Sequence, residues 1–175
     1  MCCFADGDTF DNNSGDFDFD IVTEAAKAVL AAKPSSAVKV LTDGTKPVTA
    51  FIPTDKAFRT LAWNLSGNWI TSEQGVFNAV AGLGIPAVEK VLLYHVVPKA
   101  TIDAATALKS NGAQLNTAAG LTLGVQTRPA QGIVQLVEKD TNYFNPVVIA
   151  PDINKGNKQI AHGINLVLRP MDLPI

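Results

Sequence analysis

Residues 49–61, TAFIPTDKAFRTL, have the pattern of a strand that leads directly into a helix. The strand signal is the β-prone run at 48–52, which Pro53 halts because proline has no backbone N–H for a strand ladder. Thr54 suits a helix N-cap, and Asp55 falls in the first helical turn. An apolar stripe at helical spacing follows, made of Phe58, Leu61, Ala62 and Leu65. The stretch therefore predicts a short strand followed by an amphipathic helix that ends at Gly67.

Residues 91–98, VLLYHVVP, predict the end of another helix and contain one of the two histidines. Pro86 suits the first helical position. The positions i, i+3, i+4 and i+7 are then held by Val88, Val91, Leu92 and His95. This spacing places His95 on the buried stripe of a helix that Pro98 ends. Tyr94 lies one position off the stripe, so we expect it to reach the surface.

The two histidines receive different predictions. A buried imidazole must satisfy both ring nitrogens, since each unpaired one would cost about 1–3 kcal/mol. We expect Thr54 and Asp55, at the start of the other helix, to be the partners of His95. His162 stands between an alanine and a glycine, and we expect it in a turn, exposed or locally hydrogen-bonded.

The remaining segments divide into a helical first half and a strand-rich second half. Helices are predicted from residue 21 to Pro34, from Ser35 or Ser36 to 41, from Thr71 or Ser72 to 81, and over 103–108. Strands are predicted at 114–117, 121–126, 132–138, 147–150, 159–161 and 164–168. Regular βαβ alternation is missing, which favours an α+β fold: a single compact domain whose helical layer packs on short strands from the second half. Residues 1–16 are predicted to be a flexible acidic tail and residues 17–175 the domain.

Composition excludes several classes of protein. The net charge of −2 and the lack of a Lys/Arg cluster argue against a nucleic-acid partner. No apolar run approaches the roughly 20 residues that span a bilayer, and the first residues do not resemble a signal peptide. The cysteines, Cys2 and Cys3, are adjacent and poorly placed to bridge each other. An acylated cysteine would account for them, so membrane proximity through a lipid anchor remains open.

Motifs for catalysis, cofactors and metals are missing from the chain. No serine lies in a G-x-S-x-G elbow, and the glycines form neither a P-loop nor G-x-G-x-x-G. The aspartates of the tail do not fit a calcium-binding loop, and the histidines lack zinc-site spacing. We therefore predict no catalytic residue, no cofactor and no metal.

Three stretches together resemble the fasciclin-like domain. They are TAFIPTDKAFRTL at 49–61, VLLYHVVPKATI at 91–102 and IAHGINLVLRPMDLP at 160–174. Their order and spacing fit that family over about residues 17–174. In the third stretch, Leu166 stands where the family often has His, and Arg169 where it often has Asp.

The resemblance implies a non-enzymatic adhesion module, secreted or held in the cell envelope. Its partner would be a cell-surface protein or a cell-wall or matrix polymer, and the domain would be monomeric. Adhesion residues of the family correspond here to Pro151, Asp152 and Ile153, and to the Tyr94–His95 pair. Around the first group the chain departs from the family pattern, with Ala150 in place of an acidic residue and Asn154 in place of an apolar one. The alternative for Asp152 is a strand-to-loop turn in which its carboxylate caps backbone groups.

Two other functions stay open. A small-molecule or lipid-binding domain could use a crevice between the strands, lined by Trp63, Trp69, Phe77, Tyr143 and Phe144. A small hydrolase would pair His95 or His162 with Asp55 or Asp152 in one pocket.

Overall fold

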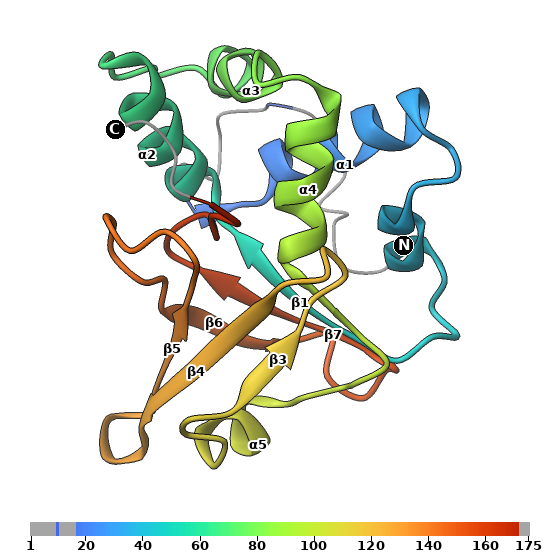
Figure 1. Cartoon of the computed structure of the whole chain (residues 1–175), viewed down its shortest axis with the longest axis vertical. Helices are drawn as coiled ribbons and strands as arrows, with labels where there is room; N and C mark the ends of the chain where they lie inside the picture. Colours follow the sequence, from blue (N-terminus) through green and yellow to red (C-terminus); the bar gives the residue numbers. More distant parts are fainter. Residues whose placement is uncertain (1–9, 11–16, 172–175) are drawn as a thin grey trace.

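A computed structural model of the chain describes residue 10 and residues 17–171 (Figure 1). The predicted tail, residues 1–16, lies outside the described residues except for Phe10, whose ring lies 5.6 Å from that of Phe77. Cys2 and Cys3, the candidate anchor, also lie outside them.

The helices follow the sequence patterns closely. They are α1 (Asp20–Ala32), η2 (Ala37–Thr42), α2 (Asp55–Ser66), α3 (Glu73–Ala81), α4 (Ile85–Tyr94), α5 (Ala104–Leu108) and the 3₁₀ turn η3 (Pro129–Gln131). The predicted cap of α2 is confirmed, because Thr54 Oγ1 accepts a hydrogen bond from the Ala57 amide at 3.4 Å. Ser72 caps α3 in the same way, and Gly67 ends α2 with a left-handed φ of 70°.

The strands form two sheets. They are β1 (Val48–Pro53), β2 (Val96–Pro98), β3 (Gln114–Asn116), β4 (Thr122–Arg128), β5 (Ile133–Val137), β6 (Val148–Ile153) and β7 (Gln159–Ile164). One sheet has the order β2-β1-β7-β6, with β1 and β7 parallel, and the other is the antiparallel sheet β3-β4-β5. The α+β class is confirmed, and β1 and β2 show that the first half also contributes strands.

Two local predictions about the strands are wrong. The sequence predicts a helix up to Pro98, but residues 96–98 form β2. Helix α4 ends at Tyr94, where the His95 amide donates to the Leu92 carbonyl at 3.1 Å in a tight last turn. Residues 165–168 are not a strand, since β7 ends at Ile164. The Leu168 amide instead donates to the His95 side chain, so it cannot extend the ladder.

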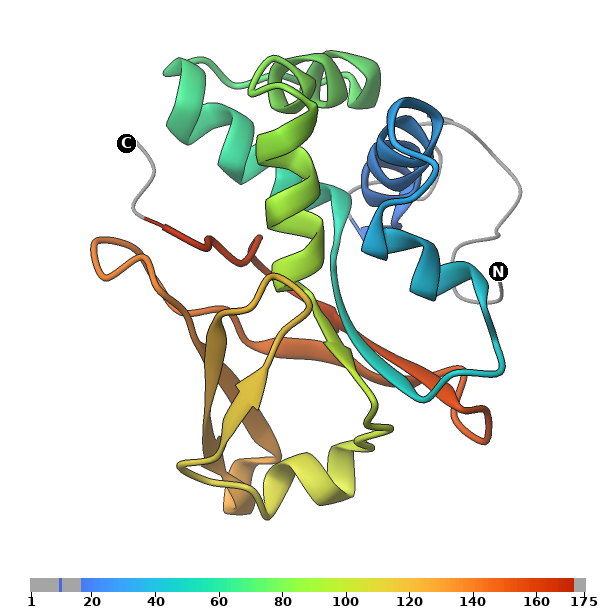
Figure 2. The same cartoon turned by 45° about the vertical axis from the view of Figure 1, so that its right-hand side comes forward.

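The four-stranded sheet is the middle layer of the molecule. Figure 2 shows α1 to α4 on one side of it, and the three-stranded sheet with α5 on the other. Side chains of β1 alternate accordingly: Ala50 and Ile52 pack among the helices, whereas Phe51 packs with Leu123 and Leu136 of the second sheet. β1 is therefore buried along its whole length.

No single helix within the described ranges is long and apolar enough to cross a membrane. Only α3 and α4 taken together reach that length and composition, and they are bent by 105° at the break between them.

Candidate functional site

A cavity of about 250 Å³ lies where the two sheets and α5 meet. Apart from His162, its lining residues are of apolar types or glycine: Phe51, Ala104, Ala107, Leu108, Gly132, Val134, Val148, Ile149, Pro151 and His162. The parallel register of β1 and β7 sets Phe51 beside His162, and the two rings stack with centroids 5.8 Å apart. The cavity therefore has an aromatic wall and an apolar rim formed by the edge strand β6.

His162 occupies a different place from the one predicted. It lies inside β7, is only 2% exposed, and accepts a hydrogen bond at Nδ1 from the Asp152 amide at 3.1 Å. Its Nε2 therefore carries the proton and donates to the Ile102 carbonyl at 2.8 Å. The prediction of an exposed turn is wrong, because Gly163 lies inside β7 and makes no turn. A Cβ there would lie 2.9 Å from that of Ala150, so this glycine serves close strand contact.

Asp152 follows Pro151, which lines the cavity, and has a left-handed φ of 60°. Its Oδ1 accepts a hydrogen bond from the Ala104 amide at 2.7 Å, and its Oδ2 pairs with Lys155 Nζ at 2.8 Å. Partial burial acts to raise the pKa of Asp152, but Lys155 and the Ala104 amide outweigh it and hold that pKa below its usual value. The carboxylate thus caps the start of α5, as the alternative interpretation of this residue proposed.

The neighbours of Asp152 differ in their access to solvent. Pro151 is exposed, whereas Ile153 is partly buried and packs against the helical core. In β6 the exposed side chains alternate, so Ile149 and Pro151 point out together at the edge of the four-stranded sheet. This edge is the accessible part of the predicted adhesion segment.

His95 is buried as predicted, but with other partners. Its Nδ1–H donates to the Val91 carbonyl at 2.8 Å, and its Nε2 accepts from the Leu168 amide at 2.9 Å. Burial, opposed by the Val91 carbonyl, lowers the pKa of His95 to about 4, so the ring is neutral. The expected partners Thr54 and Asp55 serve helix starts instead: Thr54 caps α2, and Asp55 accepts from the Ile21 amide.

Tyr94 is completely buried, so the prediction that it reaches the surface is wrong. One face of α4 packs on the helical core through Val88 and Val91, and Tyr94 packs between the sheets. Its hydroxyl donates to the Thr122 carbonyl at 3.1 Å. Burial, together with the Glu138 charge, raises the pKa of Tyr94 to about 12.

Arg169 forms a buried polar network that the sequence did not predict. Its guanidinium lies 3.2 Å from Asp140, 2.9 Å from Asn64 Oδ1 and 3.9 Å from the ring centroid of Tyr143. Its amide donates to the Glu138 carboxylate. Burial raises the pKa of Glu138 to about 8, although Arg169 opposes the shift. The available signal was a charged residue within the otherwise apolar run at 166–171, because a buried guanidinium requires partners.

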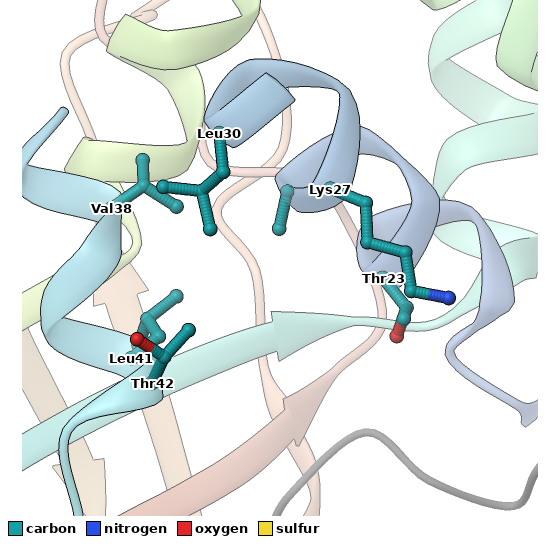
Figure 3. A pocket seen from close by; sticks show the side chains of 7 residues that line it. Thr23, Lys27, Leu30, Val38, Leu41 and Thr42 are labelled. Carbon is teal, nitrogen blue, oxygen red and sulfur yellow. The ribbon is translucent and has the colours of Figure 1, made fainter. Parts of the chain in front are cut away.

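None of the five aromatic residues predicted to line a ligand-binding crevice lines the cavity beside His162. Trp63, Trp69 and Phe144 are exposed, and Phe77 contacts Phe10. Tyr143 packs on Arg169. A small pocket between α1 and η2, lined by Leu30, Val38 and Leu41 among others (Figure 3), has a volume of about 30 Å³. That volume holds about one water molecule, so the cavity beside His162 is the better candidate for a ligand.

All four ring nitrogens of His95 and His162 bond to the main chain. A general base needs a ring nitrogen that can reach a substrate proton. The arrangement therefore does not supply the pairing of His95 or His162 with Asp55 or Asp152 that a hydrolase would use.

Comparison with known proteins gives a family match, similar solved structures and one negative result. The family model described as the fasciclin domain matches residues 23–170. A domain pair of the insect cell adhesion molecule Fasciclin I has a similar structure, with a TM-score of 0.59 and 18% sequence identity. The similarity covers 85% of this chain and 46% of that one, so this chain spans about half the length of the insect pair. A search of curated protein sequences finds no match.

Proposed function

Because this chain belongs to the fasciclin domain family, we propose that it is a non-enzymatic adhesion module that acts outside the cell or in its envelope. Its partner would be a cell-surface protein or a cell-wall or matrix polymer, bound by a monomeric domain. The similarity to an insect cell adhesion molecule supports the general class. The commitment of both histidines to main-chain hydrogen bonds supports the absence of turnover at those residues.

The observation that carries the proposal is the exposed apolar edge of β6. Ile149 is 45% exposed, and Pro151, which follows it two positions later, is exposed on the same strand. Solvent-exposed apolar side chains on an edge strand are a common basis for contact with another chain. We therefore place the adhesion surface at Ile149 and Pro151, with Asp152 holding the segment in shape and Ile153 packed against the helical core.

A binding assay on intact cells and purified extracellular polymer tests this surface. Ile149→Ser and Pro151→Ser should each reduce retention of the labelled domain by about tenfold, the effect of losing roughly 1.4 kcal/mol of binding free energy. Phe144→Ser is the matched control, because that side chain is 77% exposed but belongs to the loop after β5. Unchanged retention for both β6 variants would remove the β6 edge from consideration.

A second function, binding of a small apolar molecule, is favoured by the cavity itself. Its volume of about 250 Å³ is slightly below the usual range of about 300–1,000 Å³ for ligand pockets. Octanoate and 1-octanol should raise the melting temperature if this function is present. Val134→Phe would fill the cavity and should abolish that shift without affecting retention on cells.

A further inference from the structure

A groove borders the cavity beside His162. Leu108, the last residue of α5, lines both spaces, so the two are adjacent. The groove lies between α5 and the turn that joins β4 to β5 (Figure 2), and its other lining residues are Ala105, Lys109, Asn111, Thr127 and Pro129. Three of these side chains are polar, whereas the cavity is lined by apolar residues and glycine apart from His162. A molecule that occupies both spaces therefore meets an apolar surface at one end and a polar one at the other.

The polar side chains of the groove offer hydrogen-bond donors that are not in use. Asn111 Oδ1 accepts from the Thr127 amide at 2.9 Å, which leaves the Nδ2 group of Asn111 to donate elsewhere. Thr127 Oγ1 is buried and has no hydrogen-bond partner among the described residues. Lys109 is exposed, and its ammonium group pairs with no carboxylate within the described ranges. A buried hydroxyl without a partner is costly, so Thr127 Oγ1 is the atom that most clearly calls for a ligand group.

The charge of the groove favours an anion. Lys109 is its one charged lining residue in the part of the chain that the structure describes. Asp103 and Asp152, the carboxylates at the start of α5, both pair with Lys155, at 3.3 and 2.8 Å. Their charge is therefore balanced without Lys109. A carboxylate only accepts hydrogen bonds, and its two oxygens together can accept from all three donors of the groove.

We propose that the cavity and the groove together bind one single-chain amphiphile with an anionic head. Its acyl chain fills the cavity, and its carboxylate accepts hydrogen bonds from Lys109, Asn111 and Thr127. The inference rests on the second function proposed above, the binding of an apolar molecule in the cavity, and adds the class of ligand. The cavity volume of about 250 Å³ suits one short chain rather than the two chains of a phospholipid. Both ring nitrogens of His162 bond to the main chain, so the donors for the head group are those of the groove.

Calorimetry of the full chain at neutral pH with octanoate, 1-octanol and acetate tests this assignment. Octanoate and 1-octanol have chains of the same length, but only octanoate is charged. Octanoate should bind about fivefold more tightly than 1-octanol, because its carboxylate gains charge-assisted hydrogen bonds at an exposed site. This preference should shrink at high NaCl concentration, since salt screens exposed charges. Acetate should bind far more weakly than octanoate, because it has no chain to fill the cavity.

Two variants remove the proposed head-group donors without disturbing the cavity. Lys109→Gln should weaken octanoate binding about fivefold and leave 1-octanol binding unchanged. Thr127→Val should weaken octanoate binding about threefold, and it should not lower the melting temperature, since the hydroxyl has no partner to lose. A hydroxyl that serves only a structural role, or that bonds only to water, would leave octanoate binding unchanged in Thr127→Val. Lys90→Gln, on α4 across the four-stranded sheet, is the matched control and should keep the full preference for octanoate.

Three results would overturn the proposal, and each has a different meaning. Equal binding of octanoate and 1-octanol, with no effect of Lys109→Gln, would leave a cavity for apolar molecules without a head-group site. Acetate that binds as tightly as octanoate would make the groove an anion site independent of the cavity. No binding of either octanoate or 1-octanol would remove the second proposed function together with this inference.

Discussion

The space between the two sheets is filled at one end and hollow at the other, and a histidine marks each end. At the filled end, Tyr94 and Leu168 are completely buried, and the His95 ring joins α4 to the chain after β7. At the hollow end, His162 has an equivalent pair of main-chain hydrogen bonds but faces a cavity of about 250 Å³. The same side-chain chemistry thus completes a core in one place and lines a cavity in the other. The surroundings of each imidazole, rather than its hydrogen bonds, therefore decide whether the histidine is only structural or part of a candidate binding site.

Replacement of the two histidines by alanine should show the largest difference. His95→Ala leaves the Leu168 amide unsatisfied in a dry core and removes a packed ring, so it should reduce the free energy of unfolding by about 3–5 kcal/mol. His162→Ala should cost about 1–3 kcal/mol, because water in the cavity can reach the amide of Asp152. Urea unfolding of both variants at pH 7 measures the difference. An equal loss would mean that the hollow end is as dry as the filled one.

Acidification should affect the filled end through His95. Its pKa is about 4 in the folded chain and 6.5 as the ordinary value. Below pH 6.5 the unfolded chain therefore binds a proton that the folded chain does not, and stability falls as the pH drops from 6.5 to 4. The loss from this group should reach about 3 kcal/mol near pH 4.

Unfolding measured between pH 7 and pH 4 isolates this contribution when wild type is compared with His95→Gln, which cannot take up the proton. The variant is less stable at neutral pH, but its stability should fall less steeply below pH 6.5. His162→Gln serves as the control for the substitution itself. Parallel pH profiles for wild type and His95→Gln would show that the ring titrates normally in the folded protein.

Two valines allow a direct test of packing at the two ends. Val97 and Val134 are each 4% exposed, but Val97 belongs to the filled cluster and Val134 lines the cavity. Val97→Phe forces extra volume into a packed core and should cost about 1–3 kcal/mol. Val134→Phe can place its ring in the cavity and should change stability by less than about 1 kcal/mol. Equal losses in chemical denaturation would show that the cavity cannot accept a side chain.

The contrast also explains what the sequence could predict. The strand, cap and helix at 49–61 depend on contacts within one segment, and the structure has them where local spacing placed them. The surroundings of Tyr94, His162 and Arg169 depend on segments that are distant in the sequence, such as the second sheet and the close strand contact at Gly163. Periodicity shows which residues lie on the apolar face of one helix or strand. It does not show which distant segment packs against the remaining faces. The cavity arises from such assembly, so no local pattern could reveal it.

The smallest expected effect concerns Asp152, and it tests whether the segment beside the hollow end is structural or functional. Asp152→Ala removes the acceptor for the Ala104 amide and should cost about 1 kcal/mol, the usual loss for a helix cap. Asp152→Asn keeps a carbonyl acceptor and loses only the partly exposed pair with Lys155, so it should cost less than about 0.5 kcal/mol. If Asp152 only holds the segment in shape, the asparagine variant should also retain full binding to cells, while the alanine variant weakens it slightly. A loss of binding in Asp152→Asn without a loss of stability would instead make the carboxylate a direct contact with the partner. The hollow end would then combine an apolar edge with a specific charge.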